Sequence, residues 1–117
     1  MKIMKKRKTV LITGATSGIG FALAKCFGKE GYDLILVSSS KERLYQTEVK
    51  LLQFMQGGKN GIVTICQDLS MPDAAQKINQ QLKKKKVSVD ILVNNAGVGL
   101  IGEAVTNDAE KLNQMLQ

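Results

Sequence analysis

A short apolar run that ends in three glycines constrains the fold of this chain more than any other feature. Residues 9–13 (TVLIT) are apolar or β-branched, and Gly14, Gly18 and Gly20 follow at spacings of four and two. A helix-like pattern of apolar residues begins directly after them. Glycines placed in this way let a strand turn tightly into a helix whose N-terminus attracts a phosphate. A glycine-rich turn that binds no ligand would have the same glycines, so the rest of the sequence decides between these interpretations.

A second strand-like run, much later in the chain, ends in the polar and small residues 94–97 (NNAG). Together, the two segments resemble the short-chain dehydrogenase/reductase family. Residues 13–20 match its TGxxxGxG cofactor loop, and residues 94–97 match its NNAG motif. The resemblance covers the chain from about Lys8 to Gln117 and implies a nicotinamide-dependent oxidoreductase that acts on carbonyl or hydroxyl compounds.

Apolar runs and helical periodicity alternate along the chain. Gly31 is placed to end the first helix, Ser39 and Glu42 have the spacing of a capping box, and Pro72 suits a first helical turn. We expect strands at 9–13, 34–38, 62–66 and 89–93, and helices at 19–30, about 40–56, 72–84 and from 106 onward.

Right-handed crossovers between such strands predict a doubly wound parallel α/β sheet, here a partial Rossmann-like fold. The resemblance implies the strand order 3-2-1-4. In that order the first and fourth strands diverge, so both glycine-bearing loops should meet in one crevice at the carboxyl edge. We expect residues 1–8 to be a basic tail. Residues 9–117 are expected to be one NAD(P)-binding domain, truncated before the family's catalytic segment.

Three expectations concern burial. The fourth strand is expected to expose an apolar edge, which would favour self-association. Cys26 and Cys66 are expected to be buried, reduced thiols and neither a disulfide nor metal ligands. The first helix is expected to bury one apolar stripe made of Ile19, Ala22, Leu23, Cys26 and Phe27.

The net charge of +7, from 17 Lys and Arg against 10 Asp and Glu, invites a nucleic-acid hypothesis. Nine of the basic residues lie in two clusters, the tail at 2–8 and the run at 83–86. The second cluster is placed at a helix end, where the macrodipole favours cations, and no aromatic residues alternate with the basic ones. We therefore expect no nucleic-acid partner. Salt-dependent DNA binding that NADPH does not displace would indicate the alternative.

No apolar run approaches the ~20 residues that span a bilayer. The basic start is followed by too short an apolar stretch for a signal peptide. We therefore expect a cytoplasmic protein with no membrane partner. The chain contains no histidine, which excludes histidine-dependent catalysis and histidine-based zinc sites within it. We expect no metal site.

The end of the second predicted strand indicates which dinucleotide the chain prefers. Ser38, Ser39, Ser40 and Lys41 stand there without a carboxylate, and Asp33 lies at the opposite end of the strand. An acid at this end would hold the ribose hydroxyls of NAD, whereas hydroxyls and a lysine accept the 2′-phosphate of NADP. We therefore favour NADP(H) over NAD(H), although similar NADP enzymes often carry an arginine at the position of Ser39. The serines can also serve as helix caps.

The resemblance implies further roles after the third and fourth strands. Asp68 would accept from the adenine amino group and the Leu69 N–H would donate to a ring nitrogen; alternatively, Asp68 caps the third helix. Residues 95–97 would hold the ribose region, and Asn94 would brace the loop through neighbouring backbone. Residues 98–102 either line the nicotinamide pocket or form a plain loop. The expected cofactor-binding residues are Thr13, Gly14, Thr16, Ser17, Gly18, Ile19, Gly20, Ser38, Ser39, Ser40, Lys41, Asp68, Leu69, Asn95, Ala96 and Gly97.

No catalytic residue is expected in this chain. The family uses a Tyr-x-x-x-Lys pair for proton transfer, but Tyr32 and Tyr45 are followed four residues later by Leu36 and Val49. The family pattern places its catalytic serine, tyrosine and lysine after Gln117. The leading hypothesis is therefore the cofactor-binding amino-terminal part of an NADP(H)-dependent oxidoreductase, which is a homo-oligomer when complete. The alternative is a non-catalytic dinucleotide-binding module or a decayed, truncated gene product.

Overall fold

The computed structural model describes residues 7–56, 58–95 and 102–104. In this part of the chain, five strands form one sheet with the order β3-β2-β1-β4-β5. The strands are β1 (Thr9–Thr13), β2 (Asp33–Ser38), β3 (Ile62–Cys66), β4 (Ile91–Asn94) and β5 (Gly102–Ala104). Strands β1 to β4 are parallel, which confirms the expected sheet and its order 3-2-1-4.

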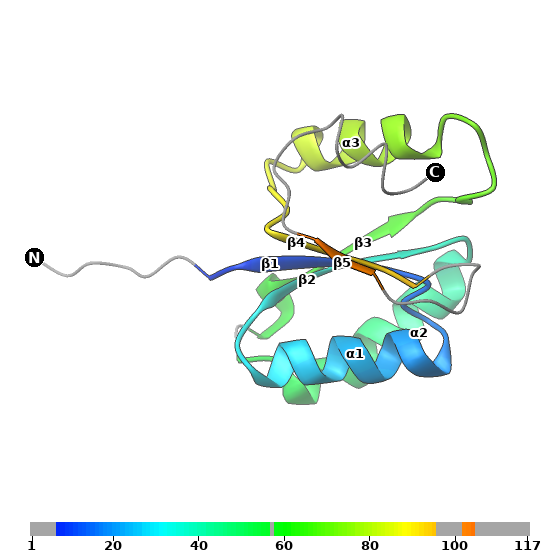
Figure 1. Ribbon diagram of the computed structural model, residues 1–117. Coiled ribbons are helices and arrows are strands. Elements are labelled where there is room, and N and C mark those ends of the chain that lie inside the picture. The colour runs from blue at the N-terminus through cyan, green and yellow to red at the C-terminus, as the bar shows by residue number, and fades with distance from the viewer. Residues whose placement is uncertain (1–6, 57, 96–101, 105–117) are drawn as a thin grey trace, which may run out of the picture.

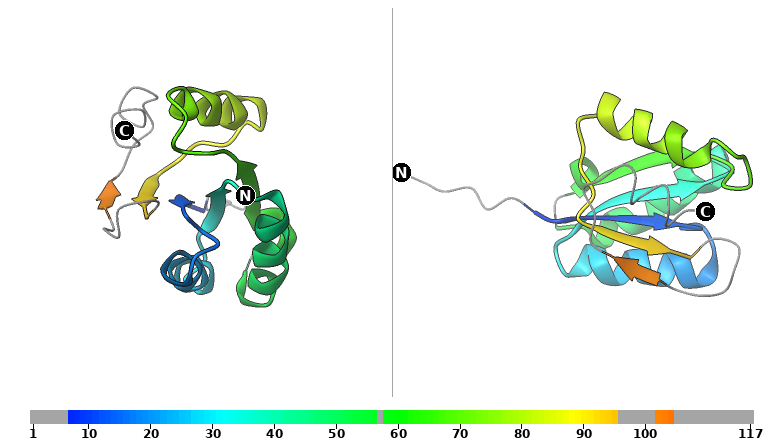
Figure 2. Two further views of the ribbon diagram at one scale, coloured as in Figure 1. Left: turned by 90° about the vertical axis from the view of Figure 1, so that its right-hand side faces the viewer. Right: turned by 45° about the horizontal axis from the view of Figure 1, so that its top comes forward.

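Helices cover both faces of the sheet, as a doubly wound fold requires. Helices α1 (Gly18–Lys29) and α2 (Lys41–Leu51) lie on one face, and α3 (Ala74–Lys84) lies on the other (Figure 1). The view along the strands shows the same three layers (Figure 2). Two short 3₁₀ turns, η1 (Leu52–Phe54) and η2 (Gly58–Gly61), connect α2 to β3. The second helix is therefore shorter than expected, because its last residues tighten into η1.

The central strands are buried on both faces. All five residues of β1 are buried, and so are the four inner residues of β2. Successive side chains alternate between two core clusters: Val10 and Ile12 pack with the α1 and α2 side, and Leu11 packs with the α3 side. Each fully buried aliphatic side chain contributes about 1.5–3 kcal/mol, so these strands anchor the fold.

Of the three predicted helix-end signals, the one at Gly31 is confirmed, whereas Pro72 precedes the N-cap Asp73 of α3 and does not lie in its first turn. Gly31 has a φ of 92°, which a residue with a side chain rarely adopts, and it follows α1 as expected. The N-cap of α2 is Ser40, whose hydroxyl accepts from the backbone N–H of Arg43. The predicted Ser39–Glu42 capping box is therefore wrong, because the helix begins one residue later than that box requires.

The predicted apolar stripe of α1 is also wrong in part. Ile19, Ala22 and Cys26 are exposed, whereas the fully buried residues of this helix are small: Gly20, Ala24 and Gly28. The half-buried Phe21, Leu23 and Phe27 pack beside them against the core. Small residues let α1 lie close to its neighbours, and a Cβ at Gly28 would lie only 2.6 Å from the Met55 sulfur. Close approach rather than apolar count decides which face is buried.

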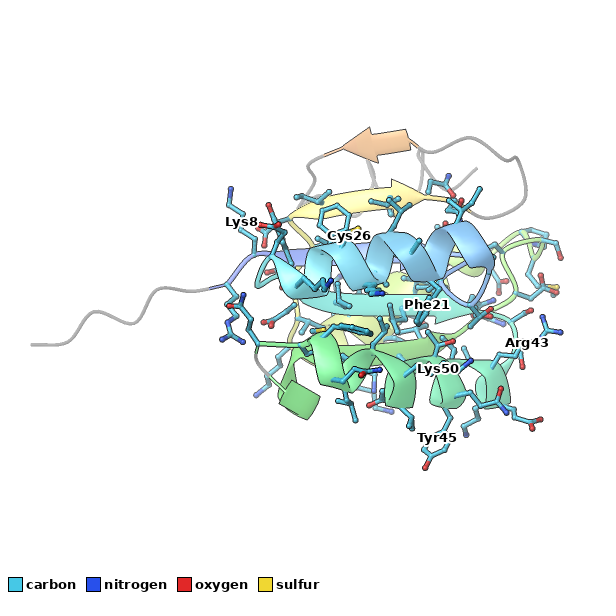
Figure 3. The ribbon with its side chains drawn as sticks, turned by 90° about the horizontal axis from the view of Figure 1, so that it is seen from below. Lys8, Phe21, Cys26, Arg43, Tyr45 and Lys50 are labelled. Carbon is cyan, nitrogen blue, oxygen red and sulfur yellow. The ribbon has the colours of Figure 1, made fainter. Side chains whose placement is uncertain are left out.

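The two cysteines differ from expectation in their exposure. Both are free thiols, as expected, but Cys26 and Cys66 are exposed rather than buried. Cys26 lies on the exposed side of α1, at the place labelled in Figure 3. Cys66 is the last residue of β3, the strand at one side of the sheet.

The expectation of an uncovered β4 edge is wrong, because β5 pairs with β4 in antiparallel orientation. The register places Leu92 opposite Ala104 and Asn94 opposite Gly102. No strand was expected at 102–104, since three residues carry too little pattern to signal one. The helix expected from residue 106, and the loop residues 98–101, lie outside the described part of the chain.

Candidate cofactor site

The carboxyl ends of β1, β2, β3 and β4 lie at the same edge of the sheet, at the right-hand side of Figure 1. The chain leaves these strands at Thr13, Ser38, Cys66 and Asn94. In open parallel sheets, ligands bind outside this edge, where neighbouring strands send their connections to opposite faces. The edge therefore brings together the segments expected to bind the cofactor.

The turn after β1 is built around Gly14, which has a φ of 62°. The Ser17 hydroxyl donates to the Gly14 carbonyl oxygen at 2.8 Å and accepts from the Gly20 N–H at 3.2 Å, which makes Ser17 the N-cap of α1. A Cβ at Gly20 would collide with that same Gly14 oxygen. Gly14 and Gly20 are therefore required by the geometry of the turn itself.

Gly18 is different: apart from its chain neighbours and the backbone of its own helix, no atom of the described residues lies within 4 Å of the place where its Cβ would be. The structure records no hydrogen-bond partner among the described residues for the N–H groups of Gly18 and Ile19. The first turn of α1 also contains no acidic residue. An open approach, free N–H groups and the positive end of the helix dipole together suit a phosphate.

Asn94 and Asn95 connect the end of β4 to the glycine loop. The Thr13 hydroxyl donates to the Asn94 side-chain oxygen at 2.9 Å and accepts from the Asn95 N–H at 2.9 Å. The Asn95 side-chain amide donates to the Gly14 carbonyl oxygen at 3.3 Å. The Asn95 side chain thus braces the backbone of the glycine loop, and the Asn94 side chain is tied to Thr13; the backbone bracing expected of Asn94 itself stays a prediction. Ala96 and Gly97 lie outside the described residues.

At the end of β2, hydroxyl groups link two loops. The Thr16 and Ser38 hydroxyls lie 3.2 Å apart, and the Ser40 N–H donates to the Ser38 hydroxyl at 3.4 Å. Ser40 also caps α2, so one of the three serines has the structural role that the sequence left open. Ser39 and Lys41 are exposed.

Asp33 lies at the opposite end of β2, where its carboxylate is 3.9 Å from the Arg7 guanidinium. It is therefore far from the serines, as the sequence predicts.

Sequence reasoning missed two groups at this edge. Arg43 is exposed in the first turn of α2, and Figure 3 shows it beside the loops of the carboxyl edge, at the end of the molecule opposite Lys8. Its position three residues after the N-cap Ser40 was the available signal. The Cys66 thiol donates to the Ser39 carbonyl oxygen at 3.5 Å, which places it next to the serines. Nothing in the sequence reports that contact, because 27 positions separate the residues.

Asp68 lies in the turn after β3 and is exposed. Its Oδ1 atom accepts from the Ser70 N–H at 2.9 Å and from the Ser70 hydroxyl at 2.7 Å. These bonds favour the ionised form and lower the pKa of the Asp68 carboxyl below its ordinary value. Asp68 does not cap α3, whose N-cap is Asp73. The neighbouring Leu69 is half-buried against the core beneath α3.

Among the described residues, neither tyrosine is recorded in contact with the residues of the carboxyl edge. Tyr45 is exposed on α2 and points away from the sheet in Figure 3. Tyr32 packs edge-on against Phe27 at a ring separation of 5.1 Å. Among the described residues, no cluster of His, Cys, Asp or Glu has the geometry of a metal site, and no helix is long and apolar enough to cross a membrane.

Comparisons with known proteins agree with this geometry. The sequence model of the short chain dehydrogenase family matches residues 8–117. A short chain dehydrogenase of Pseudocercospora fijiensis is 38% identical over 98 residues, which are 84% of this chain and 30% of that protein. Serine 3-dehydrogenase of Agrobacterium fabrum is 41% identical over 92 residues, 79% of this chain and 34% of that protein. The chain therefore spans about a third of the length of these relatives.

Among solved structures, L-sorbose reductase of Gluconobacter frateurii, complexed with NADPH and L-sorbose, is similar with a TM-score of 0.69 and 32% identity. The match covers 80% of this chain and 35% of that protein.

Proposed function

The chain belongs to the short chain dehydrogenase family, and from that premise we propose that it binds a nicotinamide dinucleotide at the carboxyl edge of its sheet. The observation that carries the proposal is the open first turn of α1, whose Gly18 faces free space while Gly14 and Gly20 are held by the turn. Packing among the described residues gives no reason for a glycine at position 18. A ligand that approaches the backbone there gives one.

In this proposal, the pyrophosphate lies against the N-terminus of α1 and meets the N–H groups of Gly18 and Ile19. Thr13, Ser17 and Asn95 hold the loop in shape through the bonds described above. The adenine ring lies near the turn after β3, where Asp68 and the Leu69 N–H face it. The ribose next to the nicotinamide lies near the end of β4.

We propose NADP(H) as the preferred form of the cofactor. The end of β2 and the start of α2 carry Ser38, Ser39 and Lys41, and Arg43 stands in the same first turn of α2. No carboxylate stands at the end of β2 itself. Hydroxyls and cations accept the 2′-phosphate, whereas an acid there would repel it. Glu42 is the one acid in the first turn of α2. The similar L-sorbose reductase was solved with NADPH, which supports the same preference.

For the whole protein, we propose hydride transfer between the nicotinamide ring and a carbonyl or hydroxyl carbon of a small molecule, in a homo-oligomer. When bound, the cofactor supplies the hydride. The residues of this chain bind and orient it. An assay of NADPH oxidation across a panel of aldehydes and ketones tests this activity.

A non-catalytic dinucleotide-binding module is the second candidate, because neither Tyr32 nor Tyr45 has a lysine four residues later. Such a module would bind NADPH without oxidising it in the presence of any carbonyl compound.

The binding proposal is tested by NMR titration of the protein with NADPH. The backbone amides of residues 14–20, 38–40 and 68–69 should shift in a saturable way. The amides of Thr9 and Asp33, at the opposite edge, should not. Shifts confined to the opposite edge, or no shifts, would contradict the proposed site.

A further inference from the structure

The carboxylate of Asp68 is held by a single neighbour. Both the N–H and the hydroxyl of Ser70 donate to the same oxygen, Oδ1, at 2.9 and 2.7 Å. Two donors on one oxygen fix the rotation of the carboxylate, since turning it would break both bonds. They also leave the second oxygen, Oδ2, without a hydrogen bond to any of the described residues.

The residue that follows Asp68 carries a free donor. The structure records no partner among the described residues for the N–H of Leu69. Asp68 Oδ2 and the Leu69 N–H therefore offer an acceptor and a donor on adjacent residues. The exposed edge of adenine presents the complementary pair, an amino group that donates and a ring nitrogen that accepts. Hypoxanthine, in which an oxygen replaces the amino group, presents the reverse pair.

We propose that Ser70 is a positioning residue that aims the Asp68 carboxylate, so that the site selects dinucleotides with a 6-amino purine over those with a 6-oxo purine. This inference rests on the proposed dinucleotide site. Ser70 does not contact the base itself. It acts by holding Oδ1, which leaves Oδ2 as the oxygen that meets the base, and by keeping the carboxylate ionised as an acceptor.

The structure allows the hydroxyl to be removed without loss of the turn. The Met71 N–H donates to the Asp68 carbonyl oxygen at 3.3 Å, and the backbone N–H of Ser70 remains in any variant. Ser70 is exposed, so its replacement leaves no buried cavity. Ser70→Ala therefore removes one of the two bonds to Oδ1, and Ser70→Thr retains the hydroxyl.

The test compares the affinity of the protein for NADPH and for its hypoxanthine analogue by calorimetry. The measured quantity is the ratio of the two dissociation constants. In Ser70→Ala this preference for NADPH should fall by about fivefold, because a charge-assisted bond that orients the acceptor is lost. Ser70→Thr should restore it. The control is Ser88→Ala, which changes an exposed serine between α3 and β4 and should leave the ratio unchanged.

The possible outcomes distinguish failure of the proposed cofactor site from failure of the proposed role of Ser70. If the unaltered protein binds neither dinucleotide, the proposed cofactor site is wrong and the inference falls with it. If NADPH binds but the ratio is the same in the unaltered protein and in Ser70→Ala, the cofactor site stands and the role of Ser70 is overturned. A purely structural role would weaken both dinucleotides equally and leave the ratio unchanged, which also overturns the inference.

Discussion

The side-chain amide of Asn95 donates to the hydroxyl of Ser17 at 3.1 Å, although 78 positions separate the two residues. Ser17 is the N-cap of α1, and Asn95 follows β4 directly. This bond, together with the one from Asn95 to the Gly14 carbonyl oxygen, joins the two sequence motifs into one unit. The glycine loop is therefore held in place by the residue that follows the neighbouring strand β4 and does not depend only on its own turn.

Two glycine substitutions should separate stability from binding. Gly20→Ala should lower the free energy of unfolding by about 3 kcal/mol, because the new Cβ collides with the Gly14 carbonyl oxygen and the backbone must move. Gly18→Ala should change it by less than about 1 kcal/mol, since its Cβ enters open space. Urea denaturation of both variants measures the difference.

Gly18 should matter more for the affinity for NADPH than for the stability of the fold. Gly18→Ala, which folds normally, should weaken NADPH binding by about tenfold, since the Cβ occupies the approach of the pyrophosphate to the helix N-terminus. Unchanged affinity in a folded Gly18→Ala protein would mean that the phosphate lies elsewhere.

The Thr13 hydroxyl should matter for stability. Thr13 is fully buried, and its hydroxyl bonds both Asn94 and the Asn95 N–H. Thr13→Val keeps the shape but removes both of these buried bonds, so the free energy of unfolding should fall by about 2 kcal/mol. The matched control is Thr64→Val on β3, where no side-chain hydrogen bond is recorded within the described chain. Equal losses in both variants would contradict the role of Thr13.

The cofactor preference should respond to charge at Ser39. Ser39→Asp should shift the ratio of NADPH to NADH affinity toward NADH by about tenfold or more, because a carboxylate repels the 2′-phosphate and accepts from the ribose hydroxyls. The control is Ser39→Asn, because asparagine has nearly the same size as aspartate but no charge. It should shift the ratio of the two affinities much less. If the aspartate variant keeps the original preference, the 2′-phosphate pocket is misplaced.

The titration of Asp68 should depend on Ser70. In the folded protein the pKa of Asp68 lies below its ordinary value of 3.8, first through the Ser70 N–H and then through the Ser70 hydroxyl. A carboxyl group whose pKa is lower in the folded than in the unfolded protein stabilises the fold at pH values above its ordinary pKa. This stabilisation is lost as the pH falls through the pKa of the folded protein. In Ser70→Ala the pKa of Asp68 should rise. Carboxyl NMR titration measures it directly, and a pKa that does not move would show that the hydroxyl contributes nothing.

Much of the fold follows from local sequence signals. The apolar runs at 9–13 and 62–66 form strands with the predicted bounds, because apolar and β-branched residues favour strands. Only the first run is buried throughout, since β3 lies at one side of the sheet. The buried face of α1 does not follow, since it is set by how closely Gly20 and Gly28 let the helix approach its neighbours. A count of apolar residues contains no information about that distance.

The candidate site, like the fold, could be predicted from the sequence only in part. The glycine loop and the residues after β4 are signalled by their motifs. The bond from Asn95 to Ser17 is not, because it exists only once β1 and β4 lie side by side. The roles proposed here for Arg43 and Ser70 were missed for a related reason. An arginine in a first helical turn and a serine in a loop are ordinary residues until the structure shows what lies beside them.

The central claim is that the carboxyl edge of this sheet binds a nicotinamide dinucleotide. Calorimetric titration of the protein with NADPH, and separately with NADH, tests it most directly. The account predicts saturable binding of one equivalent, with NADPH bound about tenfold more tightly than NADH. Equal affinities would contradict the NADP(H) preference, and the absence of binding by either dinucleotide would contradict the site itself.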